Sequence, residues 1–533
     1  MGTHPKEPAS SDSWTEAREA GLVRACKLWD SMEAEEVKKA YMRFRPFPAA
    51  GKAGKSVVCE CCGLSVRACS LKWAEFLSVE VESIEHYFRF REKGVDMGLG
   101  CAMDSLLHTG HAKYQTDLSV YWAHITKVIV LLKMEEVAKY VAMGGRLKAR
   151  QEMENRFPCM YLSAEEALEL LVKKDDFNFP LNTYERANVF ALSYSWHARE
   201  HPDPTGTTAE TVVQGLRETK NWWLSKCRKF LTAGWEEGEK LLKRERGGKR
   251  EKKEGEEDEE SWMEKHFKKQ SNEEESVSLP YSTWGFPLLF QDFPSLPQRP
   301  RTPEEDICFS KGLSLLSCLY GNTSFQVYFL RCTEIPSDLE EVTNRTPYDE
   351  RGWTNFESRV SSVKHKDYIL QVGPLSQTLV QIPLSPPAFQ KKLDDKRREE
   401  ESESNPEGFV VRFTNGRTDR ELVSELYKRF ILDTQVSCQR VISMWGKYEI
   451  DTLEKGEMLG DYFRWIGEQP QCEVEEVCLW GCSLNALSLP PLAAGLCALS
   501  TLRELDLGSF GGAEFGPSSL EALSSLQQLK VGL

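Results

Sequence analysis

Three short segments near the C-terminus repeat one spacing of apolar residues. VEEVCLWG, LRELDLGS and LQQLKVGL all read apolar-x-x-apolar-x-apolar. The first apolar residues of the three segments are Val474, Leu502 and Leu526, which are 28 and then 24 residues apart. A single pair of amphipathic helices would not keep this register, so the spacing predicts stacked structural repeats with a shared core.

An L-x-x-L-x-L spacing with a period in the twenties is typical of leucine-rich repeats. Stacked repeats present an extended surface to a partner, so we expect residues 471–533 to bind another protein. The residues expected to form the repeat core are Val477, Leu479, Leu502, Leu505, Leu507, Leu526 and Leu529.

Upstream of the repeats, apolar runs alternate with helical patterns between residues 156 and 437. NVFALSYSW (188–196), GFPLLFQDF (285–293) and SFQVYFLRC (324–332) are short apolar runs typical of buried strands. The alternation predicts an α/β fold with a doubly wound, mostly parallel sheet. In such sheets ligands bind beyond the carboxyl ends of the strands, where we expect the polar residues that follow these runs to converge.

Helix start signals stand between the predicted strands. Ser163 and Glu166 have the spacing of a capping box, in which each side chain accepts a backbone N–H of the other residue. Thr302 is followed by Pro303, which is typical of an N-cap and a first helical residue. We therefore expect helices to begin at both places.

Segments of a different character surround and interrupt the α/β domain. We expect a flexible N-terminus over 1–55, a mainly helical region over 56–155 and a helical connector over 438–470. Two charged blocks, 238–275 and 391–404, are predicted to be solvated insertions, because long charge runs rarely pack into a core.

The overall charge and hydropathy exclude some classes of function. The formal net charge of −14 disfavours nucleic acid as a partner, because phosphate binding needs clustered positive charge. No apolar run approaches the roughly 18 residues that predict a membrane span. The first residues lack the apolar core of a secretory signal, so we expect a cytoplasmic protein.

The sequence contains 16 cysteines, and we expect reduced thiols rather than disulfides. The one cluster consists of Cys59, Cys61 and Cys62, followed by Cys69. Zinc is an alternative interpretation there, but structural zinc sites need a second pair of ligands at set spacing, which is missing. No metal or cofactor is therefore predicted.

Three motifs occur in the order found in heterokaryon incompatibility (HET) domains. They are ALSYSW at 191–196, QDFPSLPQ at 291–298 and RGWTNFE at 351–357. By these motifs the region from about 160 to 435 resembles a divergent HET-like domain. His197 stands where the family has a glycine, and Phe356 stands where it has a glutamine. The resemblance implies a fold related to Toll/interleukin-1 receptor (TIR) domains.

In the enzymatic TIR proteins, a glutamate four residues after a tryptophan supports hydrolysis of NAD at the nicotinamide–ribose bond. Trp353 and Glu357 have that spacing, so the resemblance implies Glu357 as the catalytic candidate. A carboxylate near the ribose could stabilise an oxocarbenium-like transition state, as in glycoside hydrolysis. The candidates for ligand binding are Tyr194, Trp196, Asp292, Arg351 and Trp353.

Two functions remain open at this point. The first is a signalling or recognition protein, in which the HET-like domain self-associates or gives the output and the repeats bind a partner. The second is an NAD-cleaving enzyme, with NAD as its substrate. The motif alone also fits a plain helix start, in which Trp353 and Phe356 are buried and Glu357 is a surface charge.

Overall fold

The computed structural model divides the chain into two compact units. The first contains the described residues up to Leu192 and those of Pro202–Leu315, and the second contains Ser193–His201 and the described residues from Leu316 onward. The structure describes residues 127–163, 187–219, 224–247, 286–324, 326–373, 381–395, 410–413, 417–436, 440–444, 448–507 and 530–532, with positions 120, 123, 124, 166, 167 and 263 besides.

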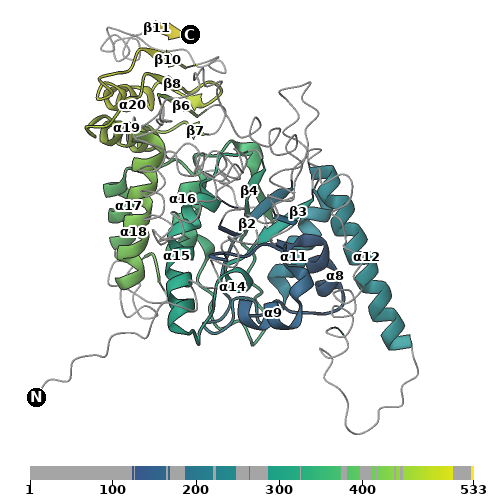
Figure 1. Ribbon diagram of the computed structural model, residues 1–533. Helices are drawn as coiled ribbons and strands as arrows, with labels where there is room; N and C mark the ends of the chain where they lie inside the picture. The colour runs from purple at the N-terminus through teal and green to yellow at the C-terminus, as the bar shows by residue number, and fades with distance from the viewer. Residues whose placement is uncertain are drawn as a thin grey trace, which may run out of the picture. The chain divides into compact units, whose positions relative to one another are not determined.

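The first unit joins short strands and helices (Figure 1). Strand β2 ends in the second unit, and helix α15 runs from the first unit into the second. In chain order the elements are β1 (Leu132–Lys133), α8 (Met134–Ala142), α9 (Arg150–Arg156), η1 (Pro158–Met160), β2 (Asn188–Tyr194), α11 (Thr207–Glu218), α12 (Ser225–Gly247), β3 (Pro287–Phe290), α14 (Asp292–Ser295) and α15 (Pro303–Tyr320).

The strands of the first unit lie in the order β1-β3-β2. Strand β2 is parallel to β3, with Val189 opposite Leu288 and Ala191 opposite Phe290. Strand β1 is antiparallel to β3 and forms an edge. Every residue of β2 and β3 is buried, as expected for strands covered on both faces.

Helices α8 and α12 pack against each other along two glycines of α12 (Figure 1). A Cβ atom at Gly234 would lie 2.2 Å from the Glu135 carbonyl oxygen, and one at Gly238 would lie 2.4 Å from that of Lys139. Four residues separate the glycines, so they lie on one face of α12 and let the two backbones approach closely. The charged block expected from 238 therefore begins as part of a packed helix.

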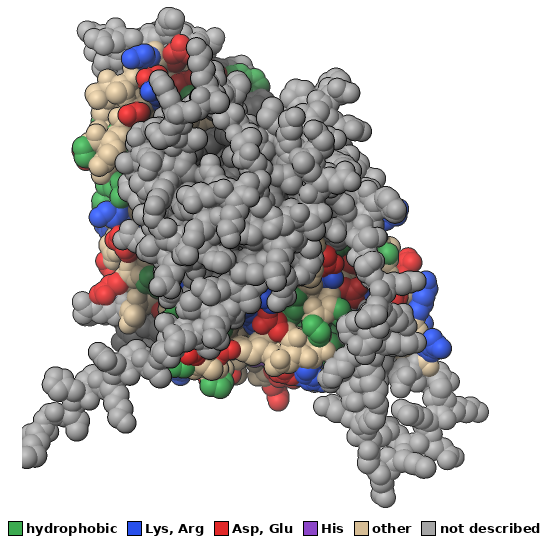
Figure 2. Space-filling view, viewed as in Figure 1, with side chains coloured by type: hydrophobic (Ala, Val, Ile, Leu, Met, Phe, Trp, Pro, Cys, Tyr) green, Lys and Arg blue, Asp and Glu red, His purple; other side chains and the backbone are tan. Residues whose placement is uncertain are grey.

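The opposite side of α12 carries the charge of that block. Lys229, Glu236, Lys240 and Lys243 are exposed. In Figure 2, basic and acidic side chains gather along the right-hand edge, where Figure 1 draws α12. The helix is thus amphipathic, with small and apolar residues facing the unit and charges facing water.

The capping contacts expected at both helix starts are present. The Ser163 backbone N–H donates to the Glu166 carboxylate at 2.7 Å, and the Glu166 N–H donates to Ser163 Oγ at 3.0 Å. The same reciprocal pair forms between Thr302 and Glu305 at the start of α15. Capping boxes are local, which is why the sequence predicts them correctly.

The second unit continues the α/β pattern and ends in a second parallel sheet (Figure 1). Its elements from α15 onward are β4 (Val327–Cys332), η4 (Tyr348–Glu350), α16 (Gly352–Ser361), η5 (Lys366–Tyr368), β5 (Ile369–Val372), α17 (Pro386–Asp394), α18 (Arg417–Ile431), η7 (Leu432–Val436), β6 (Val441–Ser443), β7 (Glu449–Ile450), α19 (Leu453–Gly467), β8 (Glu476–Cys478), β9 (Ser483–Leu484), α20 (Leu489–Leu496), β10 (Glu504–Asp506) and β11 (Lys530–Gly532).

The first part of the second unit is built on β4 and the helices that follow it. Strand β4 is parallel to β5 and entirely buried. Helix α18 packs against both α16 and α17. The α/β class with a mostly parallel sheet is therefore confirmed, since β2 with β3, β4 with β5 and the C-terminal strands pair in parallel, whereas β1 with β3 is antiparallel.

The C-terminal strands form a four-stranded parallel sheet in the order β11-β10-β8-β6. Ile442, Val477 and Leu505 occupy equivalent positions in β6, β8 and β10, and all three are buried. The residues on either side of them alternate to the other face of the sheet. Strand β6 lies within the expected connector 438–470, so the repeated unit begins earlier than the leucine pattern indicates.

Helices α19 and α20 approach each other as closely as α8 and α12 do. A Cβ atom at Gly460 would lie 2.3 Å from the Pro491 carbonyl oxygen, and one at Gly495 would lie 2.0 Å from that of Gly460. Each helix connects two neighbouring strands of the parallel sheet. The unit strand–helix therefore repeats from β6 through α20 to β10.

Candidate functional site

Helix α16 begins at the RGWTNFE motif because side chains and a close contact fix its first turn. Arg351 is the extended N-cap residue. Thr354 Oγ1 donates to the carbonyl oxygens of Tyr348 and Arg351, and Asn355 Nδ2 donates to that of Arg351 at 2.8 Å. A Cβ atom at Gly352 would lie 2.0 Å from the Phe413 ring, so glycine is required there.

Arg351 donates hydrogen bonds to three backbone carbonyl oxygens in the second unit. Its Nη1 donates to Trp196 at 2.5 Å, its Nη2 to Asn344 at 3.0 Å and its Nε to Thr346 at 2.8 Å. The side chain is buried, and burial lowers the pKa of the guanidinium to about 10. Every nitrogen of this guanidinium has a backbone acceptor, so the arrangement favours a structural role over ligand binding.

Glu357 lies at the end of a chain of buried hydroxyl groups. Ser193 Oγ donates to Glu357 Oε2, and Ser193 Oγ lies 2.5 Å from the Tyr348 hydroxyl. The single Ser193 proton goes to Glu357, so Tyr348 is the donor in its bond with Ser193. Ser358 Oγ lies 3.2 Å from the Tyr348 hydroxyl and donates to it by the same reasoning. We call Ser358, Tyr348, Ser193 and Glu357 the hydroxyl chain.

Burial and a neighbouring cation fix the state of Tyr348. Burial raises the pKa of its phenol, which therefore stays protonated and able to donate. The Arg331 guanidinium lies 4.5 Å from the centre of the Tyr348 ring, and Arg331 Nη2 donates to Asp349 Oδ1 at 2.9 Å. The hydroxyl chain is thus held at the end of β2 by groups from β4, η4 and α16.

This chain places the Glu357 carboxylate against the Ser193 hydroxyl in the last residues of the buried strand β2. A carboxylate that accepts a hydrogen bond from serine is placed to act as a base toward it. Glu357 is only 8% exposed, however, and its Oε2 is engaged by Ser193. The geometry therefore favours a cluster that fixes α16 to the end of β2.

The remaining candidates of the second unit lie around the same helix. Trp353 is half-buried, donates from Nε1 to Asp419 Oδ2 at 3.1 Å and packs edge-on against Phe356. Trp196 is half-buried and Tyr194 is buried. The structure thus brings Trp196 and Arg351 into contact, while Trp353 is held by α18.

Asp292 belongs to the first unit, where it begins α14. Its carboxylate accepts the Phe293 N–H at 2.8 Å. Gln298 Nε2 donates to the Asp292 carbonyl oxygen at 3.3 Å, and Gln151 exchanges two hydrogen bonds with the Gln298 backbone. These contacts assign the loop from Asp292 to Gln298 a structural role.

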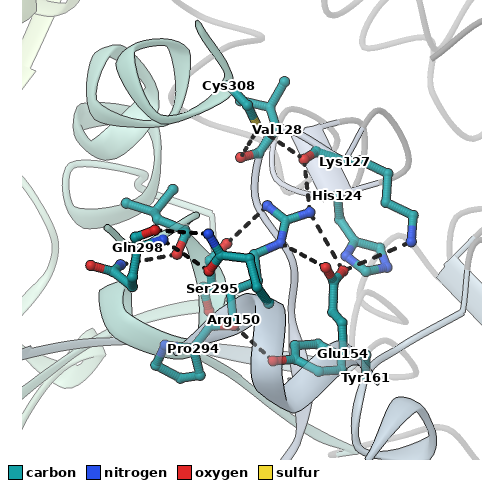
Figure 3. Close-up of polar contacts among 12 residues, drawn as sticks. His124, Lys127, Val128, Arg150, Glu154, Tyr161, Pro294, Ser295, Gln298 and Cys308 are labelled. Carbon is teal, nitrogen blue, oxygen red and sulfur yellow. Dashed lines mark hydrogen bonds and ion pairs between the residues drawn. The ribbon is translucent and has the colours of Figure 1, made fainter. Parts of the chain in front are cut away.

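Arg150 is at the centre of the polar network that holds this loop (Figure 3). It donates to the carbonyl oxygens of Lys127 at 3.1 Å and Ser295 at 3.4 Å, and pairs with Glu154 at 3.2 Å. His124 accepts the Leu131 N–H at 3.1 Å on Nδ1. Burial and the Lys127 charge lower the His124 pKa to about 3, so it is neutral. The network is fully satisfied and structural.

The expected repeat core is buried wherever the structure describes it. Val477, Leu479, Leu505 and Leu507 are at most 1% exposed, and Leu502 is 8% exposed. Leu526 and Leu529 lie outside the described residues.

The cysteine cluster Cys59, Cys61, Cys62 and Cys69 also lies outside the described residues. Within the part that the structure describes, no group of His, Cys, Asp and Glu has the arrangement of a metal site. None of the described helices is long and apolar enough to cross a bilayer.

Comparison with known proteins gives no match: no protein family, no curated protein and no solved structure resembles the chain significantly.

Two buried side chains stand out that sequence reasoning missed. Tyr348 precedes Arg351 by three residues, and Arg359 follows Phe356 by three, which places it beside Phe356 on the buried side of α16. The spacing from Phe356 is the one signal in the sequence that could have indicated a buried Arg359.

Proposed function

We propose that the chain is a recognition protein whose C-terminal repeats bind a partner protein. The observation that supports this is the parallel sheet β10-β8-β6, with Ile442, Val477 and Leu505 buried in register on one face. The other face carries a set that we call the outer row. It consists of Val441, Ser443, Glu476, Cys478, Glu504 and Asp506, all half-buried or exposed.

This arrangement is what a leucine-rich repeat segment needs in order to bind a protein. The apolar row holds neighbouring units together, and the outer row is open to a partner across several strands. With a formal net charge of −14 the partner is not a nucleic acid. The HET-like α/β part then self-associates or gives the output, in a cytoplasmic protein.

Affinity capture from the cells that express the protein tests the outer row. The double variant Glu476→Arg, Glu504→Arg reverses the charge on β8 and β10 and leaves the core unchanged. The amount of captured partner should therefore fall at least tenfold. Ala494→Arg, an exposed position on α20, is the matched control and should capture the same proteins as the wild type. Equal capture by all three proteins would reject the proposal. Sedimentation at several concentrations tests self-association.

A second candidate function is cleavage of NAD, supported by the Ser193–Glu357 contact at the end of β2. Water would add to the ribose carbon, the bond to nicotinamide would break, and nicotinamide and ADP-ribose would be released with a proton. The recognition role is better supported because Glu357 is buried and engaged.

Nicotinamide release by the purified protein, dilute and concentrated, measures this second activity. If it operates, Glu357→Gln should lower the rate at least a hundredfold, since an amide cannot carry the negative charge. Glu341→Gln, an exposed glutamate of the same unit, should keep the wild-type rate. Absence of nicotinamide at every concentration removes NAD cleavage from consideration.

A further inference from the structure

The two most exposed large apolar side chains that the structure describes occupy equivalent places in neighbouring repeats. Leu487 is 64% exposed and Leu453 is 51% exposed. Strand β7 is parallel to β9, with Ile450 opposite Leu484, and each exposed leucine follows its strand residue by three positions. Exposed apolar residues scattered singly are ordinary, but a recurrence at one place of a repeat indicates a surface that neighbouring units share.

Two contacts hold the segments that carry these leucines side by side. Before the leucines, Asn485 Nδ2 donates to the Asp451 carbonyl oxygen. After them, a Cβ atom at Gly456 would lie 2.3 Å from the Ser488 carbonyl oxygen, so the starts of α19 and α20 are in close contact. Both exposed leucines lie between these two contacts, on one edge of the repeat array.

The surface around the two exposed leucines is acidic. The exposed carboxylates near them are those of Glu449, Asp451, Glu454 and Glu457. Lys455 is the one cation among the described residues from 448 to 457, and it pairs with Asp451 at 2.6 Å. Glu457 follows Leu453 by one helical turn, so a carboxylate and an exposed leucine share one face of α19.

This combination of charge and apolar surface selects among possible occupants. The same edge of a second copy would bring like charges together, and anionic lipid would be repelled too. A basic partner gains from the charge, and apolar side chains on it would cover the leucines. Neighbouring parallel strands are about 5 Å apart, close to the roughly 5–6 Å between helix residues three or four positions apart.

We propose that the two exposed leucines bind an amphipathic helix of a partner protein, with apolar residues on one face and Lys or Arg beside them. Apolar anchors three and four positions apart on that helix meet the leucines of neighbouring repeats, and its cations meet the carboxylates around them. This inference rests on the proposed recognition role. It adds a second contact surface, because neither leucine belongs to the outer row.

A labelled peptide tests the apolar contact. It has about 18 residues, with leucines three and four positions apart and lysines elsewhere. Fluorescence anisotropy measures its binding to the full-length protein. Leu453→Gln with Leu487→Gln should weaken binding at least tenfold. Leu339→Gln with Leu422→Gln changes two other exposed leucines of the same unit, and this matched control should bind within twofold of the wild type.

Exchanged charges test the electrostatic part. A peptide with glutamate in place of lysine should bind the wild type at least tenfold more weakly than the lysine peptide does. Glu454→Lys with Glu457→Lys should reverse that preference. Equal binding of the lysine peptide to the two double leucine variants would overturn the proposal. So would equal binding by a peptide whose leucines are replaced by glutamine, since charge alone would then explain the affinity.

Two further measurements separate this surface from the others. If sedimentation shows self-association that is lost in the Leu453→Gln, Leu487→Gln variant and kept in its control, a second copy occupies the surface and the proposal fails. The outer-row variant Glu476→Arg, Glu504→Arg should bind the peptide within twofold of the wild type. If that variant instead loses the peptide, the peptide binds the outer row and the proposal is overturned, while the recognition role stands.

Discussion

At the scale of single residues, the arginine of the motif has the clearest assignment. Arg351 donates to carbonyl oxygens at positions 196, 344 and 346 and so ties two loops to the start of α16. A lysine carries its three donors on a single nitrogen, so it cannot replace a guanidinium whose Nε, Nη1 and Nη2 each donate to a different carbonyl oxygen. Arg351 therefore positions these loops.

Arg351→Lys should lower the free energy of unfolding by about 2–4 kcal/mol, because buried carbonyl groups lose their donors. Urea unfolding measures the loss. Arg345→Lys is the matched control, since Arg345 also donates to backbone carbonyl oxygens but is exposed. That control should change stability by less than about 0.5 kcal/mol. Equal losses in both variants would show that the three contacts add nothing specific.

At the scale of elements, the helix pairs α8–α12 and α19–α20 have the same packing feature. In both pairs, glycines at the contact let the two backbones approach closely. In the first pair a charged cluster lies beside the glycines: Glu135, Glu136 and Lys139 come from α8, and Glu237 comes from α12. Burial first, and then the charges of Glu136 and Glu237, raise the Glu135 pKa to about 7, while the charges of Lys139 and Lys133 act in the opposite direction. The packing of these helices is therefore sensitive to pH.

The sign of the effect follows from proton binding. The folded state holds the Glu135 proton up to about pH 7, and the unfolded chain releases it near the ordinary value of 4.5. Stability should thus fall as the pH rises from 4.5 to 7 and stay low above it. The stability of Glu135→Gln relative to the wild type should therefore be greater at pH 8 than at pH 5. Allowing for partial exposure, we expect the free energy of unfolding to differ by about 1–2 kcal/mol. Urea unfolding at both values tests this, with exposed Glu236→Gln expected to follow the wild type.

At the scale of the whole molecule, local signals predicted the elements better than their roles. The apolar runs of β2, β3 and β4 and the caps at Ser163 and Thr302 depend on neighbours in sequence, and the structure confirms them. The charge pattern from 238 onward did not reveal that α12 continues to Gly247, because the glycine contact that holds it comes from α8.

The candidate site was only partly predictable for the same reason. The order of the motifs indicated that the end of β2 and α16 belong together, and Ser193 does contact Glu357. The acceptors of Arg351 and the burial of Arg359 depend on tertiary contacts that no spacing shows. Likewise β6 joins the repeat sheet although its distance from β8 exceeds the leucine period, since Ile442 and Val477 lie 35 residues apart.

The hydroxyl chain also has a consequence for biosynthesis. Ser193 and Glu357 are separated by 164 residues, and Trp196 and Arg351 by 155. The chain leaves the ribosome N-terminus first. The hydrogen bonds at the end of β2 can therefore form only after all of the intervening residues have been synthesised. Until then, polar groups of β2 that the finished fold buries are exposed and accessible to chaperones. The rate of translation through residues 197–350 sets the length of this exposure.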